Sequence, residues 1–103
     1  MPVYNTSLTS GEIISGERQG SATAVQLPDV PCVEVNIKAV LGNSGNVYIG
    51  GPGVTKPDGA TDATTGIELD ANQETGWIAI DNLNKLYMIC DNAGDDIVYI
   101  ARR

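Results

Sequence analysis

Residues 74–101 read ETGWIAI, DNLNK, LYMIC, DNAGDD and IVYIA in succession. Three short runs rich in β-branched and aromatic residues alternate with two clusters of Asp, Asn, Gly and Lys. Apolar runs of this length favour strands, and the polar clusters between them favour turns. The stretch therefore predicts three consecutive strands joined as an antiparallel meander.

The last two runs of this stretch are apolar on both faces. Side chains alternate between the two faces of a strand, and residues 86–90 and 97–101 place apolar side chains on each face. A strand of this kind needs cover on both sides. We expect another sheet, or another copy of the chain, to supply it. The residues predicted to lie at such a subunit contact are Trp77, Tyr87, Ile89, Val98 and Ile100.

The rest of the chain also follows a period of two. In residues 33–39 the apolar side chains alternate with polar ones, and shorter strand-like runs occur at 21–27, 47–49 and 67–69. A count of about seven to nine short strands suits an antiparallel β-sandwich, or its jelly-roll variant. We therefore predict one all-β domain over residues 1–103, with the sandwich formed by residues 21–103. The face of 33–39 expected in the core consists of Val33, Val35, Ile37 and Ala39.

Residues 1–20 are expected to form an extended N-terminal arm. Ser, Thr, Gly and charged residues dominate this segment, but its apolar side chains are too sticky for a purely disordered tail. An arm of this kind can become ordered by adding to a neighbouring surface, and a mobile tail is the alternative. The arm residues expected to make this contact are Val3, Tyr4, Leu8, Ile13 and Ile14.

The charge and the apolar runs limit the classes of partner. Thirteen acidic residues against six basic ones give a formal net charge of −7, which argues against nucleic acid because phosphate binding requires clustered Lys and Arg. No apolar run approaches the ~18 residues that span a membrane, and the first residues lack the pattern of a signal peptide. We expect a soluble protein made in the cytoplasm.

Few residues suggest chemistry. The chain has no His, so the commonest catalytic constellations are missing, and we expect a non-enzymatic protein without cofactor or metal. Calcium at the oxygen-rich turn 91–96 stays an open alternative, although the spacing departs from the EF-hand. Cys32 and Cys90 are expected to be buried thiols, with a disulfide between them left open. The long loop 50–66 is a candidate binding loop, with a short β pairing expected near Val54.

Several segments resemble small structural proteins encoded by tailed bacteriophages. The similarity covers about residues 26–101, and its specific parts are VYIGGPGVT at 47–55 and DNLNKLY at 81–87. The arm before residue 21 falls outside it. The resemblance establishes no site residues.

The resemblance implies a virion component. Small acidic β-proteins of phage heads often act as decoration or cement proteins, commonly trimeric, that hold neighbouring major capsid proteins together. The expectation is a homotrimer on the capsid surface, made in the host cytoplasm and bound to the major capsid protein. The alternative is a receptor- or glycan-binding module on a tail or fibre, with the loop 50–66 and Trp77 as its recognition surface.

Overall fold

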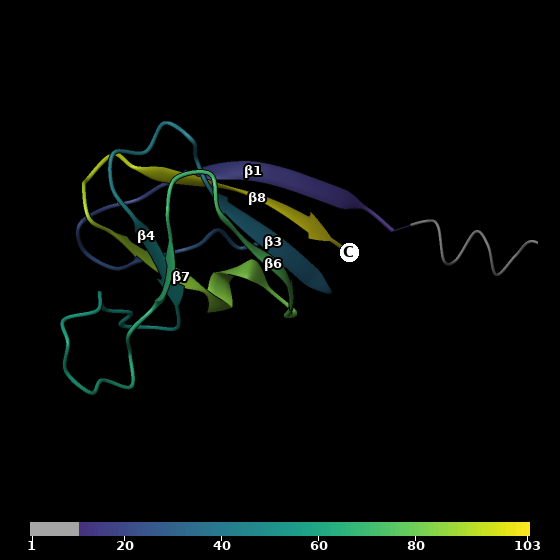
Figure 1. Ribbon diagram of the computed structural model, residues 1–103. Helices are drawn as coiled ribbons and strands as arrows, with labels where there is room; N and C mark the ends of the chain where they lie inside the picture. The colour runs from purple at the N-terminus through teal and green to yellow at the C-terminus, as the bar shows by residue number, and fades with distance from the viewer. Residues whose placement is uncertain (1–10) are drawn as a thin grey trace, which may run out of the picture.

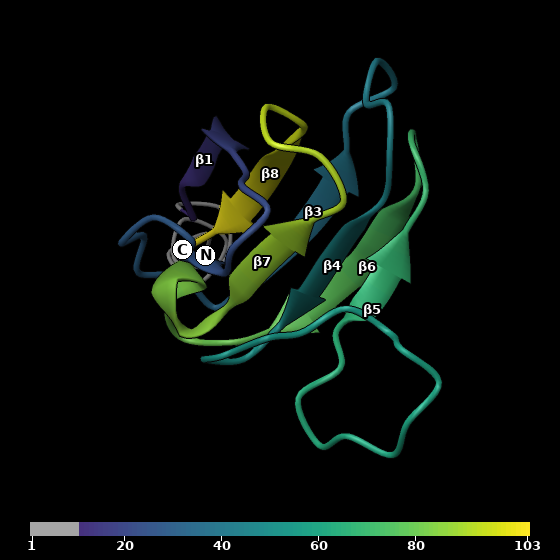
Figure 2. The same ribbon diagram turned by 90° about the vertical axis from the view of Figure 1, so that its left-hand side faces the viewer.

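The computed structural model describes residues 11–103, and these form a sandwich of two antiparallel four-stranded sheets (Figures 1 and 2). The first sheet has the order β1-β8-β3-β6, and the second has the order β2-β7-β4-β5. The strands of the first sheet, in that order, are Ile13–Gln19, Asp96–Arg102, Glu34–Ala39 and Glu74–Ala79. Those of the second are Val25–Gln26, Tyr87–Cys90, Val47–Gly50 and Ile67–Leu69. The predicted all-β sandwich is confirmed.

The core lies between the inner faces of the two sheets. In β3, the alternation expected from the sequence buries Val35, Ile37 and Ala39 completely. The second sheet meets them with side chains at alternate positions, as two packed sheets require. These facing residues are Val47, Ile49, Leu69, Met88 and Cys90. The core is mainly aliphatic, as the absence of Phe implies.

The predicted meander is wrong, although its three strands exist. β6 and β8 belong to the first sheet and β7 to the second, so the three strands do not pair with one another. The two polar clusters carry the chain from one sheet to the other. One crossing contains the 3₁₀ helix η1, Leu83–Lys85, which Asn82 caps by accepting a hydrogen bond from the Asn84 N–H at 2.9 Å. Leu83 is completely buried beneath this crossing.

The arm expected over residues 1–20 needs correction in its second half. From Ile13 to Gln19 the chain is edge strand β1, which pairs with β8 along its whole length. Ile14 packs against the core, whereas Ile13 is exposed. Val3, Tyr4 and Leu8 lie outside the described residues. If residues 13–19 formed a detached arm, β8 would be the edge strand of the first sheet. Instead, β1 is the edge strand and pairs with β8.

Val33 also differs from expectation. It was predicted to share the buried face of β3, but its side chain is 56% exposed. The strand begins one residue later, at Glu34, and the Val33 N–H donates to the Arg102 carbonyl oxygen at 2.7 Å. A period-two pattern identifies a face of a strand, but it does not show where the opposite sheet stops covering that face.

Both cysteines are buried free thiols, as expected, so no disulfide joins them. The Cys32 thiol donates to the Ile80 carbonyl oxygen at 3.3 Å, and the Cys90 thiol donates to the Asp95 carbonyl oxygen at 3.8 Å. Burial raises the pKa of each thiol. Burial also raises the pKa of the Tyr48 hydroxyl, as does its hydrogen bond to Asp91. No helix among residues 11–103 is long and apolar enough to cross a membrane.

The raised pKa values of Cys32, Cys90 and Tyr48 predict that stability falls as the solution becomes alkaline. Unfolding returns these groups to their ordinary pKa values, so above about pH 8.5 the unfolded chain loses protons that the folded chain keeps. The melting temperature should therefore decline between about pH 8 and about pH 9.5. A Cys32→Ala/Cys90→Ala variant should show a shallower decline, whatever its absolute melting temperature. An unchanged slope would contradict this assignment.

The close packing around Gly66 leaves no room for a side chain, so we expect substitution there to destabilise the fold. A Cβ added there would lie 2.7 Å from Val54 Cγ2, 3.0 Å from Tyr48 Cβ and 3.1 Å from the Ile49 backbone nitrogen. Gly66→Ala should therefore lower the free energy of unfolding by about 1–3 kcal/mol, as overpacking does. Gly51→Ala is the matched control, because a Cβ at Gly51 meets nothing within 4 Å. Equal melting temperatures for the two variants would show that Val54 does not restrict this site.

Candidate functional site

The residues predicted to form one subunit contact lie on opposite outer faces of the sandwich. Trp77, Val98 and Ile100 belong to strands of the first sheet, whereas Tyr87 and Ile89 belong to β7 of the second. On the second sheet, Tyr87 and Ile89 are partly buried. On the first sheet, Trp77 is 49% exposed, and Val98 and Ile100 are each 38% exposed. The two groups cannot contact the same flat partner surface.

The outer face of the first sheet carries the larger exposed apolar group. Ile13 joins Trp77, Val98 and Ile100 there, and these four residues are called the outer-face patch. The strand register places Ile100 and Trp77 on one row of the sheet with Asn36 between them. Ile13 lies opposite Arg102, two residues along β8 from Ile100. Trp77 points to the outer face and is 49% exposed. Apolar groups of this kind on an outer face mark interaction surfaces more often than isolated apolar residues do.

A β-bulge places Glu74 on the same face as Trp77. Residues three apart on a regular strand point to opposite faces, yet Trp77 pairs with Asn36 and Glu74 pairs with Lys38. The extra residue lies at Thr75–Gly76, where Gly76 adopts a φ of 78° that a side chain would disfavour. The Thr75 hydroxyl oxygen accepts a hydrogen bond from the Ile37 N–H at 3.2 Å. The bulge therefore adds a carboxylate to the outer face.

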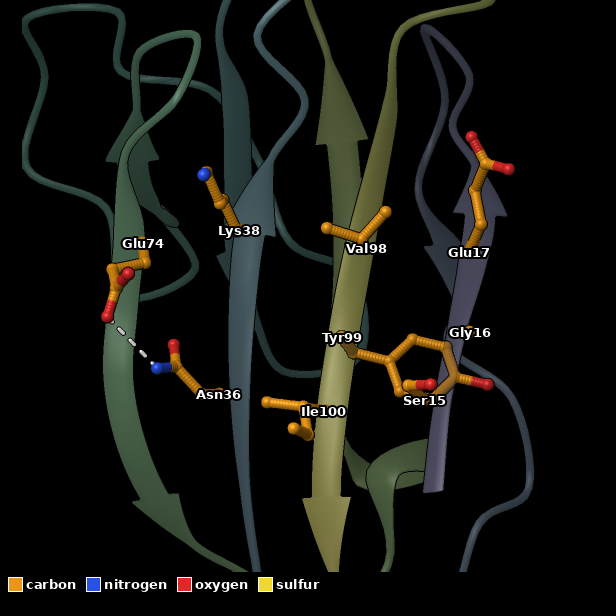
Figure 3. Close-up of a pocket in the computed structure, with 9 residues that line it drawn as sticks. All are labelled: Ser15, Gly16, Glu17, Asn36, Lys38, Glu74, Val98, Tyr99 and Ile100. Carbon is orange, nitrogen blue, oxygen red and sulfur yellow. Dashed lines mark hydrogen bonds between the residues drawn. The ribbon is translucent and has the colours of Figure 1, made fainter. Parts of the chain in front are cut away.

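An open hollow of about 500 Å³ lies on this face (Figure 3). Val98 and Ile100 project from β8 at its middle, Lys38 and Asn36 from β3 on one side, and β1 forms the other side. The residues that complete its lining are Ser15, Gly16, Glu17, Glu74 and Tyr99. The hollow combines an apolar floor with charged and amide groups at its margins.

The polar groups of the hollow are incompletely paired. The Asn36 amide donates to Glu74 Oε1 at 3.0 Å, as the dashed line in Figure 3 marks, while its Oδ1 is buried without a hydrogen-bond partner among the described residues. Glu17 lies near Asp96, and a hydrogen bond with that carboxyl group, together with its negative charge, raises the pKa of Glu17. Carboxylates therefore occupy both margins of the face.

The oxygen-rich turn at 91–96 serves the fold. Asp95 is only 7% exposed, and its carboxylate accepts hydrogen bonds from the backbone N–H groups of Ser44 and Gly45 at 3.1 and 2.9 Å. Asp91 accepts from the Asn46 N–H and from the Tyr48 hydroxyl, each at 3.1 Å. The oxygen atoms considered for calcium thus hold the turn before β4. Within residues 11–103, no three His, Cys, Asp or Glu residues gather as a metal site.

The loop between β4 and β5 projects from the sandwich (Figure 2). Its two ends are joined by a bridge between Thr55 and Thr65, and the Thr55 and Thr64 hydroxyls are 3.0 Å apart. Val54 is buried beside this closure. The short pairing expected near Val54 is therefore present. The loop leaves the second sheet, whereas Trp77 lies on the outer face of the first, so the two are carried by different layers.

A smaller apolar hollow of about 290 Å³ lies near the edge strands β5 and β6. Ile67, which is largely exposed, contributes to it from β5, and Ile78 contributes from β6. Its remaining lining residues are Ile49, Gly50, Thr75 and Leu86. It carries no charged group, so it offers little orientation to a polar ligand.

Sequence reasoning missed the polar residues of the larger hollow. Ser15, Glu17, Asn36 and Glu74 come from three strands that are distant in sequence. Only the pairing of β1 with β8 and of β3 with both neighbours brings them to one face. The Thr-Gly pair before Trp77 was the available sign of a bulge, because an isolated Gly in a strand often marks one.

The hydrogen bonds that Asp95 accepts predict that its carboxylate stabilises the fold in the absence of any metal ion. Asp95→Ala should lower the free energy of unfolding by about 2 kcal/mol or more, because it leaves the Ser44 and Gly45 N–H groups without their acceptor. Asp62→Ala, in the exposed loop, removes the same charge and serves as the control. Both variants should be measured by chemical denaturation in EDTA. Equal effects would remove the structural role assigned to the Asp95 carboxylate.

Comparison with known proteins does not assign the chain to a family. No protein-family model matches the chain, and no curated protein matches its sequence significantly. The function is therefore inferred from the surfaces described above and from the resemblance of the sequence segments.

Proposed function

We propose that the protein is a non-enzymatic capsid decoration, or cement, protein of a tailed bacteriophage, which binds the outer surface of the head and stabilises contacts between major capsid proteins. The resemblance of residues 47–55 and 81–87 supplies the class of virion protein. The observation that carries the proposal is the outer-face patch, because it supplies exposed apolar side chains on the outer face of a sheet. A surface of this shape suits protein contact better than it suits enclosure of a small substrate.

The strand order supports the same class. We infer that the order β1-β8-β3-β6 over β2-β7-β4-β5 is that of a jelly roll, an architecture used by viral capsid domains and by lectins. Because one fold serves many functions, this analogy supports the proposal only together with the surface. The homotrimer belongs to the proposal in the same way, with the outer face of the second sheet, where Tyr87 and Ile89 lie, as the candidate subunit contact.

Edge strand β1 offers a second mode of attachment. It pairs with β8 on one side only, and no other described strand bonds to it. A free edge can accept an extended segment of another protein through backbone hydrogen bonds. On a capsid, many copies repeat the same small contact, so multivalent attachment compensates for modest individual affinity. The edge of β1 is thus proposed as a capsid contact made by the second half of the expected arm, and the contact expected of Val3, Tyr4 and Leu8 stays part of the proposal.

A tail- or fibre-associated module that binds a receptor or glycan is the second candidate. The projecting loop between β4 and β5 favours it, because its exposed residues include Thr and Asp side chains that can form hydrogen bonds. Loops on a rigid scaffold commonly carry recognition. Trp77 would then act at a different surface from the loop, since the two belong to different sheets.

The copy number of the protein in purified virions tests the proposal. A cement protein should be present in numbers comparable to the major capsid protein, and particles that lack it should lose DNA at lower temperature or lower salt. Quantitative mass spectrometry against the major capsid protein measures the ratio. A handful of copies, with loss of host adsorption when the protein is removed, would favour the tail or fibre module. Complete absence from particles would overturn both candidates.

A further inference from the structure

We propose that the outer face of the first sheet binds a partner segment that carries Lys or Arg side chains among apolar ones. This inference deepens the proposed function, because it names the chemistry of the capsid segment that the face would contact. The occupant is a basic segment of another protein, and not a second copy of this acidic chain.

The outer-face patch supplies apolar side chains for contact with a partner. Val98 and Ile100 form the floor of the hollow, and Trp77 lies one strand beyond Asn36 on the same row of the sheet. All three keep more than a third of their surface exposed. Contact with apolar side chains of a partner would remove this surface from water, which is the main source of affinity in protein association.

The margins of the same face carry carboxylate groups. Glu17 and Asp96 lie toward one side and Glu74 on the other, and among the described residues that line the hollow Lys38 is the only cation. Among residues 11–103 the ion pairs join Lys85 to Asp81, Arg102 to Glu34 and Arg103 to Glu12. None of them involves the three marginal carboxylates, which therefore remain available to a cationic partner.

The local electrostatics favour an incoming cation. Glu17 and Asp96 repel each other when both are ionised, as the raised pKa of Glu17 indicates, and a nearby guanidinium or ammonium group would relieve this repulsion. The donors of Arg could also bond Glu74, which now accepts only the Asn36 amide. Oppositely charged rims are typical of complementary interfaces.

The same charges disfavour a second copy of the chain on this face. Two copies brought face to face would place acidic margins against each other, and each chain carries a formal net charge of −7. Among the described residues of each face, the cations are Lys38 and Arg102, and Arg102 is already paired with Glu34. Like charges at an interface cost free energy, so a basic partner fits this surface better than self-association does.

Titration with blocked pentapeptides, followed by ¹H–¹⁵N NMR on the full chain, tests this inference without using capsids. The probe alternates Arg with Val and Ile. The first control replaces each Arg by Glu, and the second replaces Val and Ile by Ser. We expect the Arg/Val/Ile peptide to shift the amide signals of Ser15, Glu17, Asn36, Val98 and Ile100, and both controls to bind at least about fivefold more weakly.

Two variants locate the binding. Glu17→Gln/Glu74→Gln should weaken the probe about fivefold, and Ile100→Ser should weaken it about tenfold. The matched control, Asp62→Asn/Asp70→Asn, removes the same charge from exposed positions on the loop and the following turn and should leave affinity within about twofold. The spectrum and melting temperature of each variant establish that it is folded.

Several outcomes would overturn the inference. These are no binding of the probe, equal binding of the Glu peptide, signal changes confined to other faces, or equal weakening by the control variant. A concentration-dependent dimer in light scattering that Ile100→Ser dissociates would assign the face to a second copy instead. If the peptide did not bind but virions contained the protein in numbers comparable to the major capsid protein, the proposed function would stand. The capsid contact would then lie on another surface.

Discussion

Two packed sheets bury only one face each, and this constraint governs the rest of the molecule. The inner faces supply the aliphatic core, so every apolar side chain on an outer face needs other cover or stays in water. On the second sheet, Tyr48 is buried and Tyr87 and Ile89 are partly covered. The first sheet leaves its apolar residues considerably more exposed. The two sides of the sandwich are therefore chemically different surfaces.

The β6 part of this difference comes from a small backbone irregularity. Gly76 allows β6 to take one extra residue opposite β3, and the phase of side-chain alternation changes at that point. Trp77 and Glu74 then share a face that a regular strand would have divided between core and solvent. As a result, the Trp77 ring and the Glu74 carboxylate both lie on the outer face, next to β3. A bulge in a sheet thus acts on surface chemistry as well as on strand curvature.

Period-two alternation was sufficient to predict the fold class and the burial of Val35, Ile37 and Ala39, whereas it left the orientation of Trp77 open. It was insufficient for pairing, because local pattern shows that a segment is a strand but not which strand lies beside it. The three strands were therefore predicted to pair as a meander, whereas they alternate between the two sheets. Edge strand β1 escaped prediction because its sequence, IISGERQ, is mostly polar beyond its first two residues. The polar part of the hollow depends wholly on such long-range pairing.

Because the loop between β4 and β5 is closed at its base, this chain can accept insertions in the loop. The Thr55–Thr65 bridge and the buried Val54 fix both ends of the loop, so the segment between them can vary in length without moving the sheets. Each doubling of a flexible loop costs only about 0.6 kcal/mol in closure entropy. Foreign sequence inserted near Gly59 would be displayed on an otherwise unchanged sandwich. If the protein coats a particle, the same loop could present that sequence in many regularly spaced copies.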